Sequence, residues 1–365
     1  MLKMMLFAAV AMGLSAATCA AQAAASGKSI VWHDAAGLTV EGRGWNDTES
    51  FYHRLPARAK AIVIPPVWGL ATNSAGIVVR FVSDATAIQA RWTLNNAELA
   101  MNHMAATGVS GIDLYVRLKG KWQWLAVGRP TGQQNEVALI SNMPEGLREY
   151  ALYLPLYNGV SRVELGVPDD AKLDLAPPRA RDFKPVVFYG SSITQGGCAS
   201  RPGMAYPAII GRALDIPTIN LGFSGNGRCE HEVADLLAEL DPSAYVIDAL
   251  PNMDADTVDD RINYLLKAIR AKHPESPVIL VEHAIFPSAF NRAKGPEASA
   301  TWNRALAKVY RDNAPEWNGR LRYVKCDKLM GDDGEATVDG IHPTDVGFLR
   351  MAAVLTPAVK KALGM

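Results

Sequence analysis

Short runs of alternating apolar and polar residues fill the chain from residue 30 to about residue 167. Residues 112–118 (IDLYVRL) are an example, and this two-residue period is typical of half-buried strands. Many short strands separated by turn residues favour an all-β sandwich or jelly-roll domain. Strands are predicted over residues 61–65, 76–82, 88–94, 111–118, 122–127, 148–154 and 161–166.

The pattern then changes to strands that alternate with helices. Continuous apolar strands, such as residues 278–281 (VILV), are typical of a parallel sheet buried on both faces. Five strands with helices between them predict a three-layer α/β/α domain with right-handed crossovers. The predicted strands are residues 185–189, 218–221, 244–250, 277–282 and 321–324, and the predicted helices are residues 206–214, 230–240, 256–273, 297–313 and 345–363.

These patterns divide the chain into a leader, two domains and a linker. Lys3 and the apolar residues 4–14 precede Ala-x-Ala sites near residues 21–25, which predicts a signal peptide over residues 1–25. We therefore expect export to the periplasm or the cell exterior. Cys19 follows a threonine, which makes it a poor lipid-attachment site. The β domain is predicted over residues 26–176, the proline-rich linker over 177–183 and the α/β domain over 184–365.

Charge and cysteine content exclude several classes of function. The 37 basic residues balance the 37 acidic ones, so nothing favours electrostatic capture of nucleic acid or of an anionic membrane. Removal of the leader leaves three cysteines, Cys198, Cys229 and Cys326, whose spacing fits no zinc pattern. We expect no metal site and no cofactor.

A candidate nucleophile lies at the end of the first strand of the α/β domain. The apolar run 186–189 ends in Gly190-Ser191-Ser192, and the carboxyl edge of such a sheet is where ligands bind. Ser192 is the candidate. An ordinary polar turn is the alternative, unless other strand ends supply a base, an orienting group and oxyanion donors.

Three other predicted strand ends carry those groups, in the blocks 220–227 (NLGFSGNG), 250–254 (LPNMD) and 339–343 (DGIHP). Each block alone is compatible with an ordinary turn or helix cap. Together they suit acyl transfer: Ser192 attacks, His342 accepts its proton, and Asp339 orients the imidazole. The Ser192 and Gly225 amides and the Asn252 side chain are the expected oxyanion donors.

These four blocks resemble those of the SGNH hydrolases, also called the GDSL esterase family. The resemblance implies a flavodoxin-like sheet and the same roles for the five residues just named. Two blocks depart from the family pattern. Ser191 replaces the usual aspartate before the nucleophile, and Met253 replaces the usual aspartate after the oxyanion asparagine.

A β-rich domain ahead of such a hydrolase is similar to secreted carbohydrate esterases that deacetylate plant polysaccharides. This resemblance implies an acetylated polysaccharide or oligosaccharide as the substrate. Selectivity would then come from the walls of the site, including Glu282, His283 and β-domain loops such as residues 102–110. The tryptophans of the β domain either stack on sugars or fill its core; they are Trp32, Trp45, Trp68, Trp92, Trp122 and Trp124.

Several alternatives remain open at the level of the sequence. His231 and His283 are rival bases, although neither follows a carboxylate three residues earlier. A disulfide between Cys198 and Cys229 would brace the two loops that follow the first two α/β strands. A lipase or arylesterase of the same fold is the alternative activity, and a non-catalytic carbohydrate-binding protein is the alternative class. The glycine patterns match no dinucleotide or phosphate-loop fingerprint.

Overall fold

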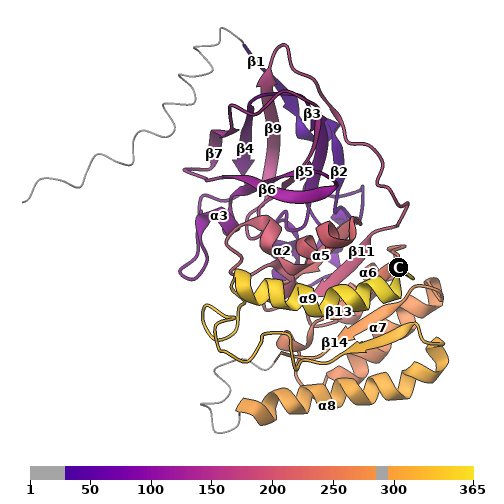
Figure 1. Cartoon of the computed structure of the whole chain (residues 1–365). Coiled ribbons are helices and arrows are strands. Elements are labelled where there is room, and N and C mark those ends of the chain that lie inside the picture. Colours follow the sequence, from indigo (N-terminus) through magenta and orange to yellow (C-terminus); the bar gives the residue numbers. More distant parts are fainter. Residues whose placement is uncertain (1–28, 285–294) are drawn as a thin grey trace, which may run out of the picture.

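The computed structural model describes residues 29–284 and 295–365. Figure 1 shows a β-rich part formed by the N-terminal half of the chain, packed against an α/β part formed by the C-terminal half. The predicted leader, with Cys19, lies outside the described residues. Within the ranges that are described, no helix has both the length and the apolar character needed to cross a membrane.

The N-terminal part is a sandwich of two antiparallel sheets, as predicted. One sheet has the strand order β1-β9-β4-β7, and the other has the order β10-β3-β8-β5-β6 with β2 paired to β3. Their inner faces enclose a core that includes Phe81, Trp92 and Leu165. The strands are β1 (Ile30–Asp34), β2 (Thr39–Glu41), β3 (Val78–Ser83), β4 (Ile88–Leu94), β5 (Ile112–Leu118), β6 (Lys121–Gly128), β7 (Gln134–Ile140), β8 (Arg148–Tyr153), β9 (Val160–Pro168) and β10 (Leu173–Leu175).

The strand predicted at residues 61–65 is wrong. This segment joins a 3-10 helix, η2 (Ala57–Ala61), to the helix α2 (Pro65–Ala71). The Pro65-Pro66 pair starts α2, where a missing N–H costs nothing, whereas a strand ladder would lose two donors. Strands β1, β2, β7 and β10 lie outside the predicted ranges. The other short helices of this half are η1 (Ala35–Gly37) and α3 (Ala106–Val109).

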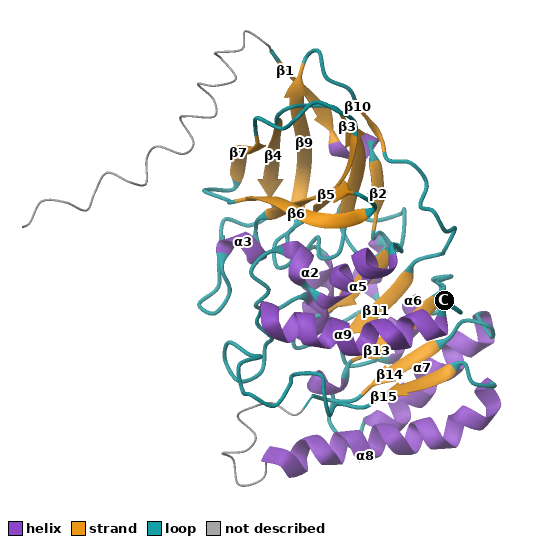
Figure 2. Ribbon diagram, in the orientation of Figure 1, coloured by secondary structure: helices purple, strands orange, loops and turns teal. Residues whose placement is uncertain are grey.

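The C-terminal part contains a parallel sheet in the order β12-β11-β13-β14-β15. Counted along the chain, this is the order 2-1-3-4-5 of flavodoxin-like folds, which confirms the predicted architecture. Figure 2 shows helices on both sides of this sheet. Its strands are β11 (Val186–Gly190), β12 (Thr218–Gly222), β13 (Ala244–Asp248), β14 (Val278–Val281) and β15 (Leu321–Val324).

The helices of this part are divided between the two faces of the sheet. Helices α5 (Tyr206–Leu214) and α9 (Asp345–Ala362) pack on one face, around Phe188 and Val246. Helices α6 (His231–Leu237), α7 (Val258–Lys272) and α8 (Gly295–Asn313) pack on the other, around Tyr189 and Ile247. The short helices are α4 (Ser192–Gln195), η3 (Pro202–Met204), η4 (Leu250–Asn252) and η6 (Ala314–Trp317).

A segment of the N-terminal half completes the core of the parallel sheet. Trp45, Leu55 and Val67 belong to the same buried cluster as Val187 and Tyr189 of β11. The segment around η2 and α2 therefore covers part of the face that α6, α7 and α8 leave open. The two halves of the sequence share one hydrophobic core at this point.

Polar contacts fix the β-sandwich against the loop that follows the nucleophile. Asp113 of β5 is fully buried and accepts hydrogen bonds from the Gly203 amide (2.8 Å), the Arg201 guanidinium (2.9 Å) and the Trp124 indole (2.9 Å). Gly108 of α3 lies so close to this loop that a Cβ there would meet the Ala199 carbonyl oxygen at 2.1 Å. The β-sandwich is thus built into one wall beside Ser192.

Candidate active site

Ser192 lies at the sharp turn between strand β11 and the short helix α4. A side chain at Gly190 would meet the Asp248 carbonyl oxygen at 2.2 Å, so only glycine fits there. The Ser191 hydroxyl caps α4 by accepting a hydrogen bond from the Ile193 amide (3.2 Å). Ser192 is the first residue of α4, and 7% of its surface is exposed. The turn therefore holds the Ser192 hydroxyl at the edge of the sheet.

The structure brings Ser192, His342 and Asp339 together. The Ser192 Oγ lies 2.9 Å from the His342 Nε2, and the His342 Nδ1 lies 2.7 Å from the Asp339 Oδ2. The Asp339 carboxylate also accepts hydrogen bonds from the Ile341 and His342 amides, at 2.9 and 2.8 Å. These amides close a turn around the carboxylate just before α9. That turn fixes the plane of the imidazole relative to Ser192.

Asp339 stays ionised over the whole range in which proteins normally work. Partial burial alone would raise its pKa. Hydrogen bonds from the His342 amide, the His342 ring and the Ile341 amide outweigh that effect and lower the pKa of Asp339 to about 2. A carboxylate that stays charged can support a positive charge on His342.

The predicted oxyanion donors lie in the segments that directly follow β11, β12 and β13. Gly225 has φ +69°, and a Cβ built there meets no heavy atom within 4 Å, so the space beside its Cα is open. The Asn252 side chain, on η4, donates to the Phe223 carbonyl oxygen at 3.3 Å and so lies against the loop that carries Gly225. The Ser192 amide belongs to the first turn of α4, where amides have no partner within the helix.

Two residues that the sequence analysis did not select support this arrangement. The Gln195 Nε2 donates to Leu156 (3.0 Å) in the β-sandwich half, and its Oε1 accepts from the Ser224 amide (3.0 Å). The Tyr157 hydroxyl donates to the Ser192 carbonyl oxygen (3.2 Å). No sequence signal marks Tyr157, because it lies in a loop of the other half of the chain. Gln195 lies in the nucleophile block, so its position was a usable signal.

The predicted wall residues Glu282 and His283 have internal partners instead. The Glu282 carboxylate accepts hydrogen bonds from the Tyr323 hydroxyl (2.7 Å) and the Cys326 amide (2.9 Å). His283 is 4% exposed, stacks on Trp302, and its burial lowers its pKa. These contacts join β14 to β15 and α8, and they give no support to a role in substrate contact.

The rival base His231 is engaged away from Ser192. Its Nε2 lies 3.2 Å from the Asp260 carboxylate, and its ring stacks on Tyr264 of α7. Both His231 and His283 thus have side-chain partners other than Ser192. His342 is the histidine that bonds to Ser192.

The predicted disulfide between Cys198 and Cys229 is wrong, because both residues are free thiols. Cys229 is buried among the residues on the α6–α7 side of the sheet, whereas Cys198 packs with the cluster on the α5–α9 side. The two cysteines therefore pack into different buried clusters, on opposite faces of the parallel sheet. The sequence places both cysteines in loops at the same edge of the sheet, but it does not show on which face of the sheet each loop packs.

The tryptophans of the β domain differ in how deeply they are buried. Trp92 is in the sandwich core, and Trp45 packs on the α/β sheet with its indole bonded to Glu239 (2.9 Å). Trp124 is half exposed, and its indole is held by Asp113. Trp124 is therefore the best-placed tryptophan for a contact outside the core.

Comparison with family models covers almost the whole described chain. Residues 183–360 match the model of the GDSL-like lipase/acylhydrolase family. Residues 30–173 match the model of the N-terminal region of SGNH-hydrolase-type esterases, whose Gly-x-Asp-Leu-Tyr signature is present here at residues 111–115 (GIDLY). Among curated proteins no match was found.

Solved structures of the same overall form include a protein from Bacteroides ovatus that was assigned as a GDSL-like lipase. It is 36% identical with a TM-score of 0.87, and the alignment covers 92% of this chain and 98% of that one. A salicylyl-acyltransferase of a tetracycline biosynthetic pathway is 17% identical (TM-score 0.73; coverage 93% and 98%). A family two carbohydrate esterase from Cellvibrio japonicus is 15% identical (TM-score 0.59; coverage 92% and 99%). The last two show the shared fold alone.

Proposed function

The chain belongs to the GDSL-like lipase/acylhydrolase family and is a carboxylic ester hydrolase, and from this premise we propose that it removes short acyl groups, acetyl in particular, from carbohydrate by serine catalysis. The observation that carries the mechanism is the unbroken chain of hydrogen bonds from Ser192 through His342 to Asp339.

In the proposed first step, the Ser192 Oγ attacks the ester carbonyl while the His342 Nε2 accepts its proton. The ionised Asp339 keeps the other ring nitrogen protonated and stabilises the imidazolium that forms. The imidazolium then protonates the leaving alcohol, which leaves an acyl-serine. A water molecule, deprotonated by His342, releases the acid and restores the serine.

The negative oxygen of each tetrahedral intermediate needs donors that are already in place. The amides of Ser192 and Gly225 and the Asn252 side-chain amide are proposed for this role. Gln195 and Tyr157 hold the loops that carry these donors, so the donors need little movement during the reaction.

The position of the β-sandwich supports a bulky alcohol group such as a glycan. Its residues 101–110 pack on the loop after Ser192, where Thr107 donates to the Ser200 carbonyl oxygen (2.6 Å). A large substrate bound at Ser192 would extend along this wall. Carbohydrate esterases and an acetyl xylan esterase share the two-part fold, which is consistent with such a substrate. Such a substrate also fits the export that the predicted leader implies.

The most informative test compares acyl donors. Acetate release would be measured from acetylated xylan, xyloglucan and pectin, alongside hydrolysis of short-chain and long-chain aryl esters. We expect acetate from at least one glycan and faster turnover of acetyl than of long acyl esters. A preference for long chains with no acetate freed from any glycan would favour the lipase alternative. No turnover of any ester would favour the non-catalytic alternative.

A further inference from the structure

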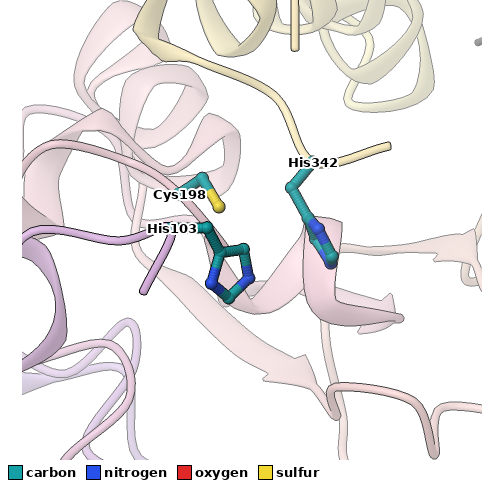
Figure 3. Close-up of side chains that lie close together, drawn as sticks. All are labelled: His103, Cys198 and His342. Carbon is teal, nitrogen blue, oxygen red and sulfur yellow. The ribbon is translucent and has the colours of Figure 1, made fainter. Parts of the chain in front are cut away.

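Three side chains of types that can bind metal ions meet beside Ser192, and they come from three separate segments of the chain. Figure 3 shows His103 from the β-sandwich half, Cys198 from the loop after the nucleophile, and His342 from the loop before α9. The potential ligand atoms of these side chains all lie within 4.8 Å of one another. We propose that this cluster is an inhibitory site for a zinc-type divalent cation, which switches the esterase off by taking the catalytic histidine.

His342 is already arranged as a metal ligand. Its Nδ1 is bonded to the Asp339 carboxylate at 2.7 Å, which directs Nε2 outward with a free lone pair whenever Ser192 releases it. Zinc-binding histidines typically have this second partner, since a carboxylate on the far nitrogen fixes the tautomer and raises the basicity of the ring. The hydrogen bond between Asp339 and His342 that suits His342 to act as a base therefore also suits it to act as a metal ligand.

His103 lies beside this histidine, and one of its ring nitrogens belongs to the cluster. The two rings are 5.4 Å apart at an interplanar angle of 67°, and the His103 Nδ1 is buried without a hydrogen-bond partner. Hydrogen bonds between Met101 and Met104 close a tight turn around His103 (3.0 and 3.3 Å), and Met104 is anchored in the core below.

The third ligand makes the site selective for softer cations. A tetrahedral zinc ion holds nitrogen ligands at about 2.0 Å and sulfur at about 2.3 Å, which puts the ligand atoms roughly 3.5 Å apart. Small side-chain rotations would bring the three groups to that spacing. A thiolate with two imidazoles favours Zn²⁺ and similar ions over Mg²⁺ or Ca²⁺. On binding, the Cys198 thiol loses its proton to water and a sulfur–metal bond forms.

Occupation of the site would stop the reaction without unfolding the protein. With its Nε2 lone pair on the metal, His342 can neither hold the Ser192 hydroxyl nor accept its proton. This consequence for activity rests on the proposed serine mechanism, whereas metal binding itself does not.

The first test is inhibition of aryl acetate hydrolysis by Zn²⁺. We expect reversible inhibition of the wild type that EDTA relieves. In His103→Gln and Cys198→Ser, half inhibition, measured against each variant's own metal-free rate, should need at least about tenfold more Zn²⁺, because each removes one ligand. Cys326→Ser is the matched control, since it removes another free thiol near acidic groups (Glu282 and Asp327) and should leave the inhibition unchanged.

The second test measures metal binding without any activity. Co²⁺ would be titrated into Cys326→Ser and into the same variant carrying Cys198→Ser or Ser192→Ala. We expect a thiolate-to-cobalt charge-transfer band in the first and the last, and its loss with Cys198→Ser. Unchanged Zn²⁺ sensitivity in His103→Gln and Cys198→Ser, or a cobalt band that survives Cys198→Ser, would overturn the proposal. A cobalt band in a protein that hydrolyses no ester would instead count against the proposed function alone.

Discussion

At the scale of single residues, Ser191 occupies the position that the family's sequence block gives to aspartate. Its hydroxyl accepts a hydrogen bond from the Ile193 amide. Ser191 therefore caps α4, a role that an aspartate carboxylate would also serve. Replacing the carboxylate removes a negative charge beside Ser192 without removing the cap. The departure from the Gly-Asp-Ser pattern is therefore a change of charge that still leaves a capping side chain at this position.

Asn252 separates oxyanion stabilisation from substrate binding. Asn252→Ala removes one of three proposed donors, so we expect kcat to fall about 10²- to 10³-fold with a small change in KM. Steady-state kinetics on an aryl acetate measure both constants. An increase in KM at constant kcat would make Asn252 a substrate-binding residue instead.

Asp248 gives the stability of the protein a pH dependence that the catalytic residues do not explain. Burial raises the pKa of Asp248 to about 7, and the hydrogen bonds from Tyr206 and Thr194 only partly oppose it. An unfolded aspartate titrates near pH 4, so the folded state binds more protons between about pH 4 and pH 7. The stability from this carboxyl is complete below about pH 4 and is lost as the pH rises through about 7.

Asp248→Asn, which keeps the shape but cannot ionise, should flatten this dependence. The loss in the wild type should amount to at most roughly 4 kcal/mol. Denaturant unfolding of both proteins from about pH 4 to about pH 8 measures it. Parallel stability curves for the two proteins would show that Asp248 does not titrate in this range.

At the scale of elements, one buried arginine attaches the η2–α2 segment to the edge of the parallel sheet. Arg54 donates to the carbonyl oxygens of Asn220 (3.2 Å) and Gly222 (2.7 Å) at the end of β12. It also donates to Leu70 and Asn73 in its own segment (2.7 and 3.0 Å). Burial lowers its pKa to about 9.

Arg54→Met should lower the free energy of unfolding by at least ~2 kcal/mol, because buried carbonyl groups lose a charged donor. Urea unfolding measures this change. Arg58→Ala is the control: Arg58 is an exposed residue of η2 that pairs with Asp47 at 2.7 Å and with Glu239, and the loss of these exposed pairs should cost less than ~1 kcal/mol. Equal effects of the two variants would show that Arg54 does not anchor the segment.

The elements that the sequence predicted well are those with a strong period and a buried face. All five strands of the parallel sheet, and helices such as α7 and α9, follow from continuous apolar runs and from helical spacing. The segment around α2 could not be predicted, because Ile62, Val63 and Ile64 resemble a strand until their packing partner is known. The position of Cys198 and Cys229 on opposite faces likewise depends on loop paths that no local pattern specifies.

The residues of the candidate site show the same difference between those that a local pattern marks and those that only packing brings to the site. Ser192, His342 and Asp339 were selected because each lies next to a predicted element within a recognisable block: Ser192 follows β11, and Asp339 and His342 precede α9. His103, Tyr157 and Arg54 come from the other half of the chain and meet the site only through packing. Glu282 and His283 end a strand as expected, but their side chains turn toward β15 and α8.

At the scale of the whole molecule, the two halves depend on each other for a complete core. Trp45, Leu55 and Val67 cover Val187 and Tyr189 of the parallel sheet. Ion pairs add to this interface, since Arg179 joins Glu41 (2.6 Å) to Asp215 (2.8 Å) at the end of α5. Removing residues 26–176 would expose this apolar face to water.

A fragment of residues 184–365 should therefore be poorly soluble and should lack ordered tertiary structure. Size-exclusion chromatography and near-UV circular dichroism compare it with a protein of residues 26–365. A monomeric, cooperatively folding fragment with full activity on acetylated polymer would show that the β-sandwich half contributes neither stability nor recognition.

The central claim, that Ser192 is the nucleophile of a serine esterase, is tested most directly by the turnover of Ser192→Ala on an aryl acetate. The substitution removes one oxygen atom, and the circular dichroism spectrum and unfolding midpoint should match those of the wild type. We expect kcat to fall by a factor on the order of 10⁶, because the three residues of the triad act as a unit. A folded Ser192→Ala protein that kept more than about a hundredth of the wild-type kcat would contradict the claim, because no loss of a nucleophile is that mild.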